Sequence, residues 1–140
     1  MFDFSLLYPM ALLVALTFFI LFNMLYLRIK AVRTRQLSPR YFRLNEGGNV
    51  SDKLKAVTQN YNNLLELPIL FYVVCVLAIL LNKNNDYFVL LAWGYVFLRV
   101  IHSAIHVTYN NIMHRLSVFA LSCIVLVMMW IKVVLLSVMI

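Results

Sequence analysis

Charged residues are scarce in this chain. They make up 12% of its 140 residues, and only five of them are acids, whereas a soluble domain carries about 25%. Cysteine is scarce as well: the chain has two, Cys75 and Cys123, and both lie in apolar runs. This placement excludes a disulfide framework or a thiolate metal cluster as the basis of the fold. The composition as a whole excludes an ordinary soluble domain.

Hydrophobic residues dominate instead, at 64% of the chain, with a mean hydropathy of +0.90. They gather in four runs, on helices long enough to cross about 30 Å of hydrocarbon. We therefore expect an all-α integral membrane protein, a four-helix bundle that forms one transmembrane domain over residues 1–140. The second helix is expected to begin in water with Ser51 as its N-cap, and only Pro68 interrupts it. The expected helices cover about 4–30, 51–81, 87–109 and 116–139.

The net charge of +7 comes mainly from the first connection between helices. That connection holds eight basic residues against two acids, the third adds Arg115, and the second has Lys83 balanced by Asp86. Basic loops stay in the cytoplasm, so the first and third connections are expected there and both termini outside. The partner of this charge is then the lipid bilayer with its anionic headgroups, and not nucleic acid. The small size favours a bacterial inner membrane, with an internal eukaryotic membrane as the alternative.

A polar stripe lies late in the third helix. Arg99, His102, His106 and Asn110 follow one another at steps of three, four and four, so they share one helical face. An arginine at membrane depth costs on the order of 2.5–3.5 kcal/mol, so such a stripe normally faces the interior of a bundle and marks a functional site. Glu66, on the antiparallel neighbouring helix, is the expected partner of Arg99 or His102.

Other interpretations of the stripe stay open. It can be a structural polar seam between helices. His102 and His106 also have a spacing that can hold zinc, with Glu66 or His114 as further ligands, although no HExxH pattern or cysteine ligand supports it and no metal is predicted. A small proton or metal transporter using Glu66, His102 and His106 is a further hypothesis.

Three short motifs resemble the MAPEG family, the membrane-associated proteins in eicosanoid and glutathione metabolism. They are Asn63-Leu-Leu-Glu66 in the second helix, Arg99-Val-Ile-His102 in the third, and Arg115 near the start of the fourth. The resemblance covers nearly the whole chain in architecture.

This resemblance implies a homotrimer with glutathione held between neighbouring subunits at the cytoplasmic side. It implies a transferase or peroxidase that acts on a lipophilic electrophile, with Arg115 as the catalytic residue beside the glutathione thiol. The residues expected to bind glutathione as substrate or cofactor are Asn63, Glu66, Arg99, His102 and His106.

Some positions depart from the family pattern. Gln59 and Asn62 stand where family enzymes usually have arginines, and His106 stands where a tyrosine is common. With fewer cations to hold carboxylates, glutathione is expected to bind weakly. The alternative is a non-catalytic membrane protein of the same fold that binds a lipid or a partner protein.

The charge distribution gives a testable topology. Reporter domains fused to the C-terminus should be active only on the side of the membrane opposite the cytoplasm, because the basic loops hold the other end of the bundle inside. C-terminal fusions that work only in the cytoplasm would contradict this orientation.

Overall fold

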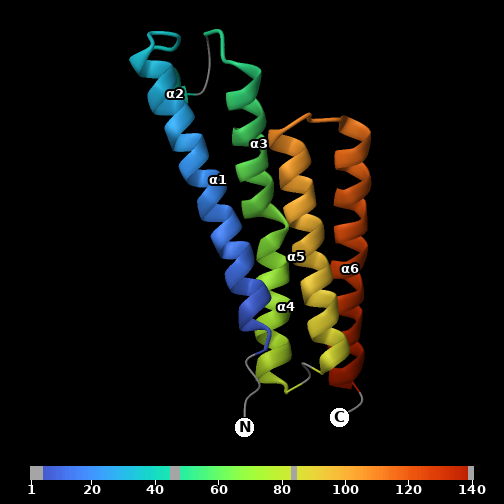
Figure 1. The fold of residues 1–140 in the computed structure, drawn as a ribbon. Helices are drawn as coiled ribbons and strands as arrows, with labels where there is room; N and C mark the ends of the chain where they lie inside the picture. Colours follow the sequence, from blue (N-terminus) through green and yellow to red (C-terminus); the bar gives the residue numbers. More distant parts are fainter. Residues whose placement is uncertain (1–4, 45–47, 83–84, 139–140) are drawn as a thin grey trace.

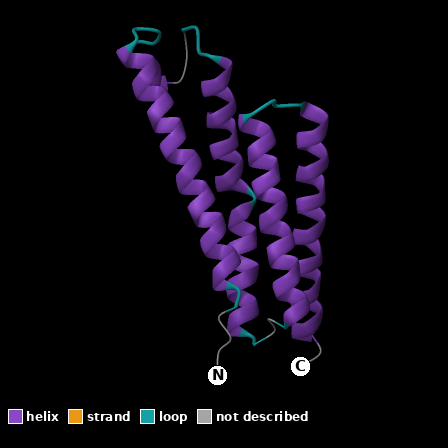
Figure 2. Cartoon of the chain, in the orientation of Figure 1, coloured by secondary structure: helices purple, strands orange, loops and turns teal. Residues whose placement is uncertain are grey.

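The computed structural model describes residues 5–44, 48–82 and 85–138, and no strand occurs among them (Figures 1 and 2). Four stretches are long and apolar enough to cross a membrane, with α3 and α4 forming one of them together. The expected all-α fold with four membrane-capable helices is confirmed. The helices are α1 (Leu7–Arg33), α2 (Tyr41–Leu44), α3 (Asp52–Glu66), α4 (Pro68–Leu80), α5 (Asp86–Val107) and α6 (Ile112–Val138).

Pro68 divides the second expected helix into two. α3 ends at Glu66 and α4 begins at Pro68, because proline has no N–H to donate and its ring crowds the carbonyl four residues earlier. Leu67 between them keeps a helical backbone, with φ −61° and ψ −38°. The chain therefore continues in the same direction and still spans the bundle (Figure 1).

Side-chain caps fix where the helices begin. The hydroxyl of Ser51 accepts a hydrogen bond from the backbone N–H of Leu54 at 3.3 Å, which confirms the expected N-cap. At the start of α6, Asn111 Oδ1 accepts bonds from the N–H groups of Met113 and His114, at 3.0 and 3.1 Å. α6 therefore begins at Ile112 rather than near 116, so Arg115 belongs to the first turn of a helix and not to a loop.

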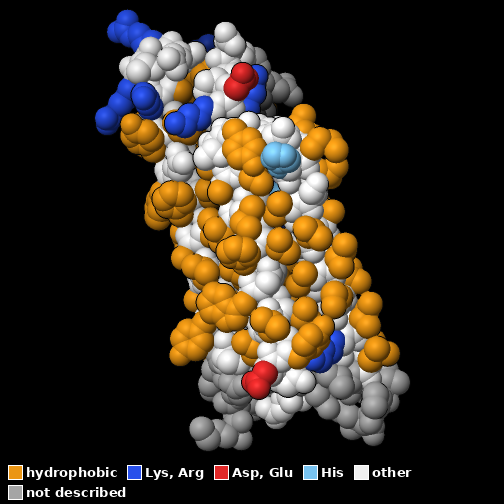
Figure 3. Space-filling view, turned by 45° about the vertical axis from the view of Figure 1, so that its right-hand side comes forward, with side chains coloured by type: hydrophobic (Ala, Val, Ile, Leu, Met, Phe, Trp, Pro, Cys, Tyr) orange, Lys and Arg blue, Asp and Glu red, His pale blue; other side chains and the backbone are white. Residues whose placement is uncertain are grey.

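The start of α1 and the end of α6 lie at one end of the bundle, and the α1–α3 and α5–α6 connections lie at the other (Figure 1). Most of the Lys and Arg side chains visible in Figure 3 gather at the end with the α1–α3 connection. The basic loop and the polar end of α5 therefore share one end, as the charge pattern predicts. Glu46 and Lys83 from the charge count, and the outermost positions 4 and 139 of the expected helices, lie outside the described residues.

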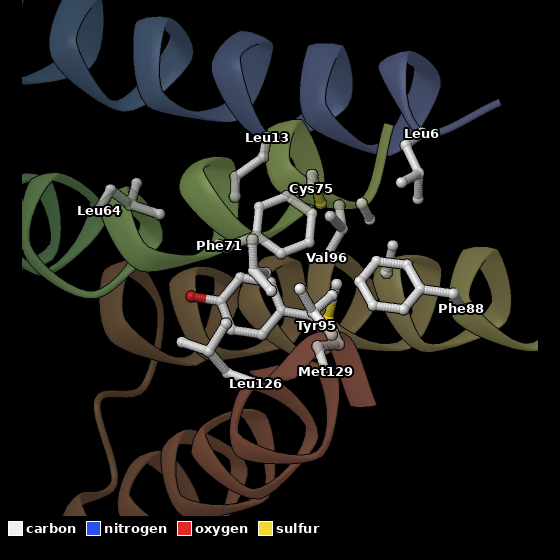
Figure 4. Close-up of a cluster of buried hydrophobic side chains, with 14 of the residues drawn as sticks. Leu6, Leu13, Leu64, Phe71, Cys75, Phe88, Tyr95, Val96, Leu126 and Met129 are labelled. Carbon is white, nitrogen blue, oxygen red and sulfur yellow. The ribbon is translucent and has the colours of Figure 1, made fainter. Parts of the chain in front are cut away.

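The main apolar core runs between α1, α3, α4, α5 and α6, and Figure 4 shows part of it. Its centre is a stack of Phe71 on Tyr95, with ring centroids 4.6 Å apart and planes 15° from parallel. Large hydrophobic side chains such as Phe18, Phe19 and Phe22 lie exposed on the outside. This arrangement suits a protein surrounded by lipid.

The stack at the centre of the core gives a stability prediction. Phe71→Ala should lower the free energy of unfolding by about 3 kcal/mol, because the ring is fully buried and its loss leaves a cavity. Phe19→Ala on the exposed face of α1 is the control and should cost less than about 1 kcal/mol. Denaturant unfolding in detergent measures both, and equal losses would contradict the placement of the core.

Candidate functional site

The polar stripe of α5 is turned into the bundle. Arg99 is 0% exposed, and His102, Ser103 and His106 are buried with it. α3 and α6 flank this end of α5 (Figure 1). Ser103 is hydrogen-bonded to Asn60 of α3, and His102 and His106 are hydrogen-bonded to Arg115 of α6. Polar groups at membrane depth are expected to point inward in this way, since lipid offers them no hydrogen bonds.

Arg99 is held by aromatic side chains. Its Nε donates a hydrogen bond to the hydroxyl of Tyr95 at 3.3 Å. Its guanidinium carbon lies 5.7 Å from the centroid of the Tyr95 ring and 5.2 Å from that of Phe119. Neither Nη atom has a hydrogen-bond partner among the described residues. The charge is therefore stabilised in part by cation–π contacts, while its outer N–H groups remain unsatisfied.

The expected pairing of Glu66 with Arg99 or His102 is wrong for this chain. Glu66 is exposed on the surface of α3, and no carboxylate of the described residues lies within salt-bridge distance of Arg99. The reason is the rotation of α3: its buried face carries Leu54, Val57, Asn60 and Leu64, which leaves Glu66 on the outer side.

His102 connects α5 to the first turn of α6. Its Nδ1 lies 3.2 Å from the backbone carbonyl of Arg115. A carbonyl only accepts hydrogen bonds, so this nitrogen carries the proton and Nε2 is a bare acceptor in the neutral ring. Nε2 is buried with no partner among the described residues.

Arg115 is tied to α5 through its side chain as well. Its Nη1 donates to His106 Nε2 at 3.1 Å and to Asn110 Oδ1 at 2.9 Å. Since arginine only donates, His106 accepts at Nε2 and carries its own proton on Nδ1. His106 was expected to bind glutathione directly, but this bond already occupies one of its two ring nitrogens.

A cleft of about 220 Å³ between α3, α5 and α6 brings part of the predicted site together. Asn63, His102 and Arg115 line it from the polar side, and Ile112, Leu116 and Phe119 line it from the apolar side. Arg99 is not among the lining residues, although its guanidinium contacts the ring of Phe119, which lines the cleft. The cleft therefore combines a cation, hydrogen-bonding groups and an apolar wall.

Asn60 is part of this end of the bundle and was missed in the sequence. It is 0% exposed, and its Oδ1 accepts a hydrogen bond from the hydroxyl of Ser103 at 3.1 Å. This bond connects α3 to α5 next to the stripe. Its position three residues before Asn63 was a usable signal, since residues three apart are neighbours on a helix.

A second cleft, of about 260 Å³, lies between α1, α2 and α3. Arg28 and Lys55 line it together with Gln59 and Asn62, the two positions that depart from the family pattern. Arg28 lies over the ring of Phe42, with 5.4 Å between its guanidinium carbon and the ring centroid. From the sequence, these two cations were interpreted as setting membrane topology and as contacting anionic headgroups. Nothing in the pattern places α1 beside the start of α3.

The described residues contain no group of three His, Cys, Asp or Glu side chains close enough to hold a metal ion. The rings of His102 and His106 are 5.7 Å apart, and His106 Nε2 is bonded to an arginine. The arrangement therefore offers no support for a zinc site or for a metal transporter.

Comparison with known protein families identifies the family of this chain. The model of the MAPEG family matches residues 6–135, nearly the whole chain. The chain belongs to the MAPEG family. No curated protein sequence and no solved structure matches it. The resemblance based on the three short motifs is thus confirmed. In this MAPEG chain, two motif residues, His102 and Asn63, meet Arg115 at one cleft.

The separation of Glu66 from Arg99 is testable in a double-mutant cycle. Arg99→Met should leave the free energy of unfolding within about 1 kcal/mol of wild type or raise it, because no buried carboxylate is left unpaired. Glu66→Gln should change it by less than about 0.5 kcal/mol. The two effects should add to within about 0.5 kcal/mol in the double variant. A coupling energy above about 1 kcal/mol would mean that the two groups meet.

Proposed function

We propose that this MAPEG protein is a glutathione-dependent transferase or peroxidase that acts on a lipophilic electrophile. The observation that carries the proposal is the cleft where Asn63, His102 and Arg115 meet an apolar wall. Glutathione carries two carboxylates, an ammonium and a thiol, so it needs cations and hydrogen-bonding groups around it. The electrophile needs the apolar side.

Arg115 is the residue proposed to act on the thiol. A guanidinium beside a thiol stabilises the thiolate, which is the nucleophilic form. The thiol proton is released to water. In the transferase reaction, the thiolate sulfur then forms a bond to the electrophilic carbon, and the leaving group departs with the electron pair of the bond that breaks. Asn63 and His102, which line the polar side of the cleft, would hold the peptide through hydrogen bonds to its amide and ammonium groups.

The electrophile would reach the cleft from the bilayer. Ile112 and Leu116 line the cleft and are exposed on the surface of α6, as are their neighbours Met113 and Leu121. An apolar molecule dissolved in lipid can therefore approach the cleft without crossing water. This arrangement supports a hydrophobic substrate rather than a polar one.

We also propose that the protein works as a homotrimer. Glu66 lies exposed on the α3–α4 stretch that is long and apolar enough to cross a membrane, and an uncovered charge within the bilayer is costly. A neighbouring subunit would cover it and would bring the second cleft, with Arg28 and Lys55, toward the cleft at Arg115. Arg28 and Lys55 would then supply the positive charge that family enzymes have as arginines at positions 59 and 62.

Native mass spectrometry in mild detergent should give a trimer of 16.4 kDa subunits, and a folded monomer alone would contradict it.

The proposed orientation places this end of the bundle in the cytoplasm, with both termini outside. It rests on the excess of Lys and Arg in the α1–α3 connection. Glutathione from the cytoplasm would then have direct access to the cleft. A bacterial inner membrane is the proposed location.

A non-catalytic member of the family is the second candidate. Gln59 and Asn62 favour it, because each replaces a cation that would hold a carboxylate. In that case the same cleft would bind a lipid or a partner protein.

Glutathione binding separates the two functions. At 10 mM, about ten times a dissociation constant of ~1 mM, glutathione should stabilise the protein by about 1.4 kcal/mol and raise its melting temperature. Arg115→Ala should keep most of this shift but lose conjugation of a lipophilic electrophile, because it removes the cation that stabilises the thiolate. Arg40→Ala, a cation in the exposed α1–α3 connection, is the matched control and should change neither. The absence of any shift in wild type would leave the non-catalytic function.

A further inference from the structure

The connection between α5 and α6 carries a side-chain contact that its backbone does not require. Asn110 has a left-handed backbone with φ +48°, and its N–H donates to the carbonyl of Ile105 at 2.8 Å, which closes the last turn of α5. Asparagine tolerates this conformation better than most residues. Its Oδ1 does something further: it accepts a hydrogen bond from Arg115 Nη1 at 2.9 Å.

A comparable turn at the other end of the bundle shows what the backbone alone needs. Asn82, which follows α4, has φ +49°, and its N–H donates to the carbonyl of Ile79. Its side chain makes no hydrogen bond with the described residues. The backbone conformation alone therefore accounts for the asparagine at position 82. At position 110 the asparagine side chain also contacts Arg115.

The side chain of Arg115 donates hydrogen bonds to two acceptors. His106 Nε2, near the end of α5, and Asn110 Oδ1, in the α5–α6 connection, accept hydrogen bonds from the same atom, Nη1. That nitrogen has two N–H groups, so these bonds use both and leave the N–H groups on Nε and Nη2 uncommitted. Because the carbonyl of Arg115 also accepts a bond from His102, both its backbone and its side chain are fixed to α5.

We propose that Asn110 and His106 are positioning residues that hold the Arg115 guanidinium at the cleft before a ligand arrives. The inference rests on the proposed function, in which Arg115 stabilises the thiolate. A free arginine side chain loses rotamer freedom when it binds, and a side chain already held in place has lost it in advance. A guanidinium fixed in the bound geometry therefore stabilises a developing charge more effectively than a mobile one.

The test compares Asn110→Gly with Asn82→Gly in the full-length protein in detergent. Glycine keeps the left-handed backbone at both positions, so only the side chain is lost. The first measurement needs no glutathione: the rate at which phenylglyoxal, an arginine-selective reagent, modifies Arg115, followed by mass spectrometry of the peptide. The rate should rise several-fold in Asn110→Gly and in His106→Leu, and should stay at the wild-type value in Asn82→Gly.

Rescue variants separate positioning from folding. Asn110→Asp and His106→Gln each keep an oxygen acceptor, so both should return the labelling of Arg115 toward the wild-type rate. In the conjugation assay, Asn110→Gly should lower kcat on the order of tenfold with a smaller change in KM, since the lost bond involves a charged group. Asn82→Gly should leave both constants unchanged.

Two results would overturn the inference: equal labelling of Arg115 in wild type and Asn110→Gly, or faster labelling with the same kcat as Asn82→Gly. Failure of the proposed function looks different. Wild type would then show no response to glutathione in the melting experiment, whereas the labelling contrast between Asn110→Gly and Asn82→Gly would remain.

Discussion

A fully buried arginine inside a membrane helix bundle constrains everything around it. Arg99 has no carboxylate partner among the described residues, so its charge depends on the rings of Tyr95 and Phe119 and on the hydroxyl of Tyr95. Tyr95 lies on α5 with Arg99, but the contact with the Phe119 ring exists only while α6 packs against α5. The stack of Phe71 on the other side of Tyr95 then links this polar end to the apolar core. The position of the polar residues therefore depends on the packing of the apolar core.

The same packing explains why Arg115 stands at a cleft. The cap made by Asn111 begins α6 early, so Arg115 lies in its first turn and directly faces the end of α5. There it meets His102, His106 and Asn110, which lie on successive turns of the chain. Asn63 of α3 completes the polar side. Three helices thus contribute to a site whose members are far apart in sequence, as is usual for sites in helix bundles.

Part of this was predictable from the sequence. The apolar runs predicted the four spans, because a bilayer sets a minimum helix length. The spacing of Arg99, His102 and His106 predicted one inward face, and the structure buries all three. The direction of Glu66 was not predictable: a stripe through Gln59, Asn63 and Glu66 and the face through Leu54, Val57, Asn60 and Leu64 differ only by a rotation of α3. The packing of α3 against α1 and α5 determines which of these two faces is buried. Asn60 lies on this buried face, and its spacing from Asn63 was a signal that the sequence offered. The early start of α6 depends on a single asparagine cap.

The central claim is that this cleft binds glutathione as a thiolate beside Arg115. Ultraviolet difference absorbance of purified wild-type protein, titrated with glutathione at neutral pH, measures this directly. A thiolate band that grows with added glutathione, saturates, and is absent from the titration of Arg115→Ala is the expected result. A titration that produces no thiolate band at concentrations where glutathione raises the melting temperature would contradict it, since the peptide would then be bound with its thiol still protonated.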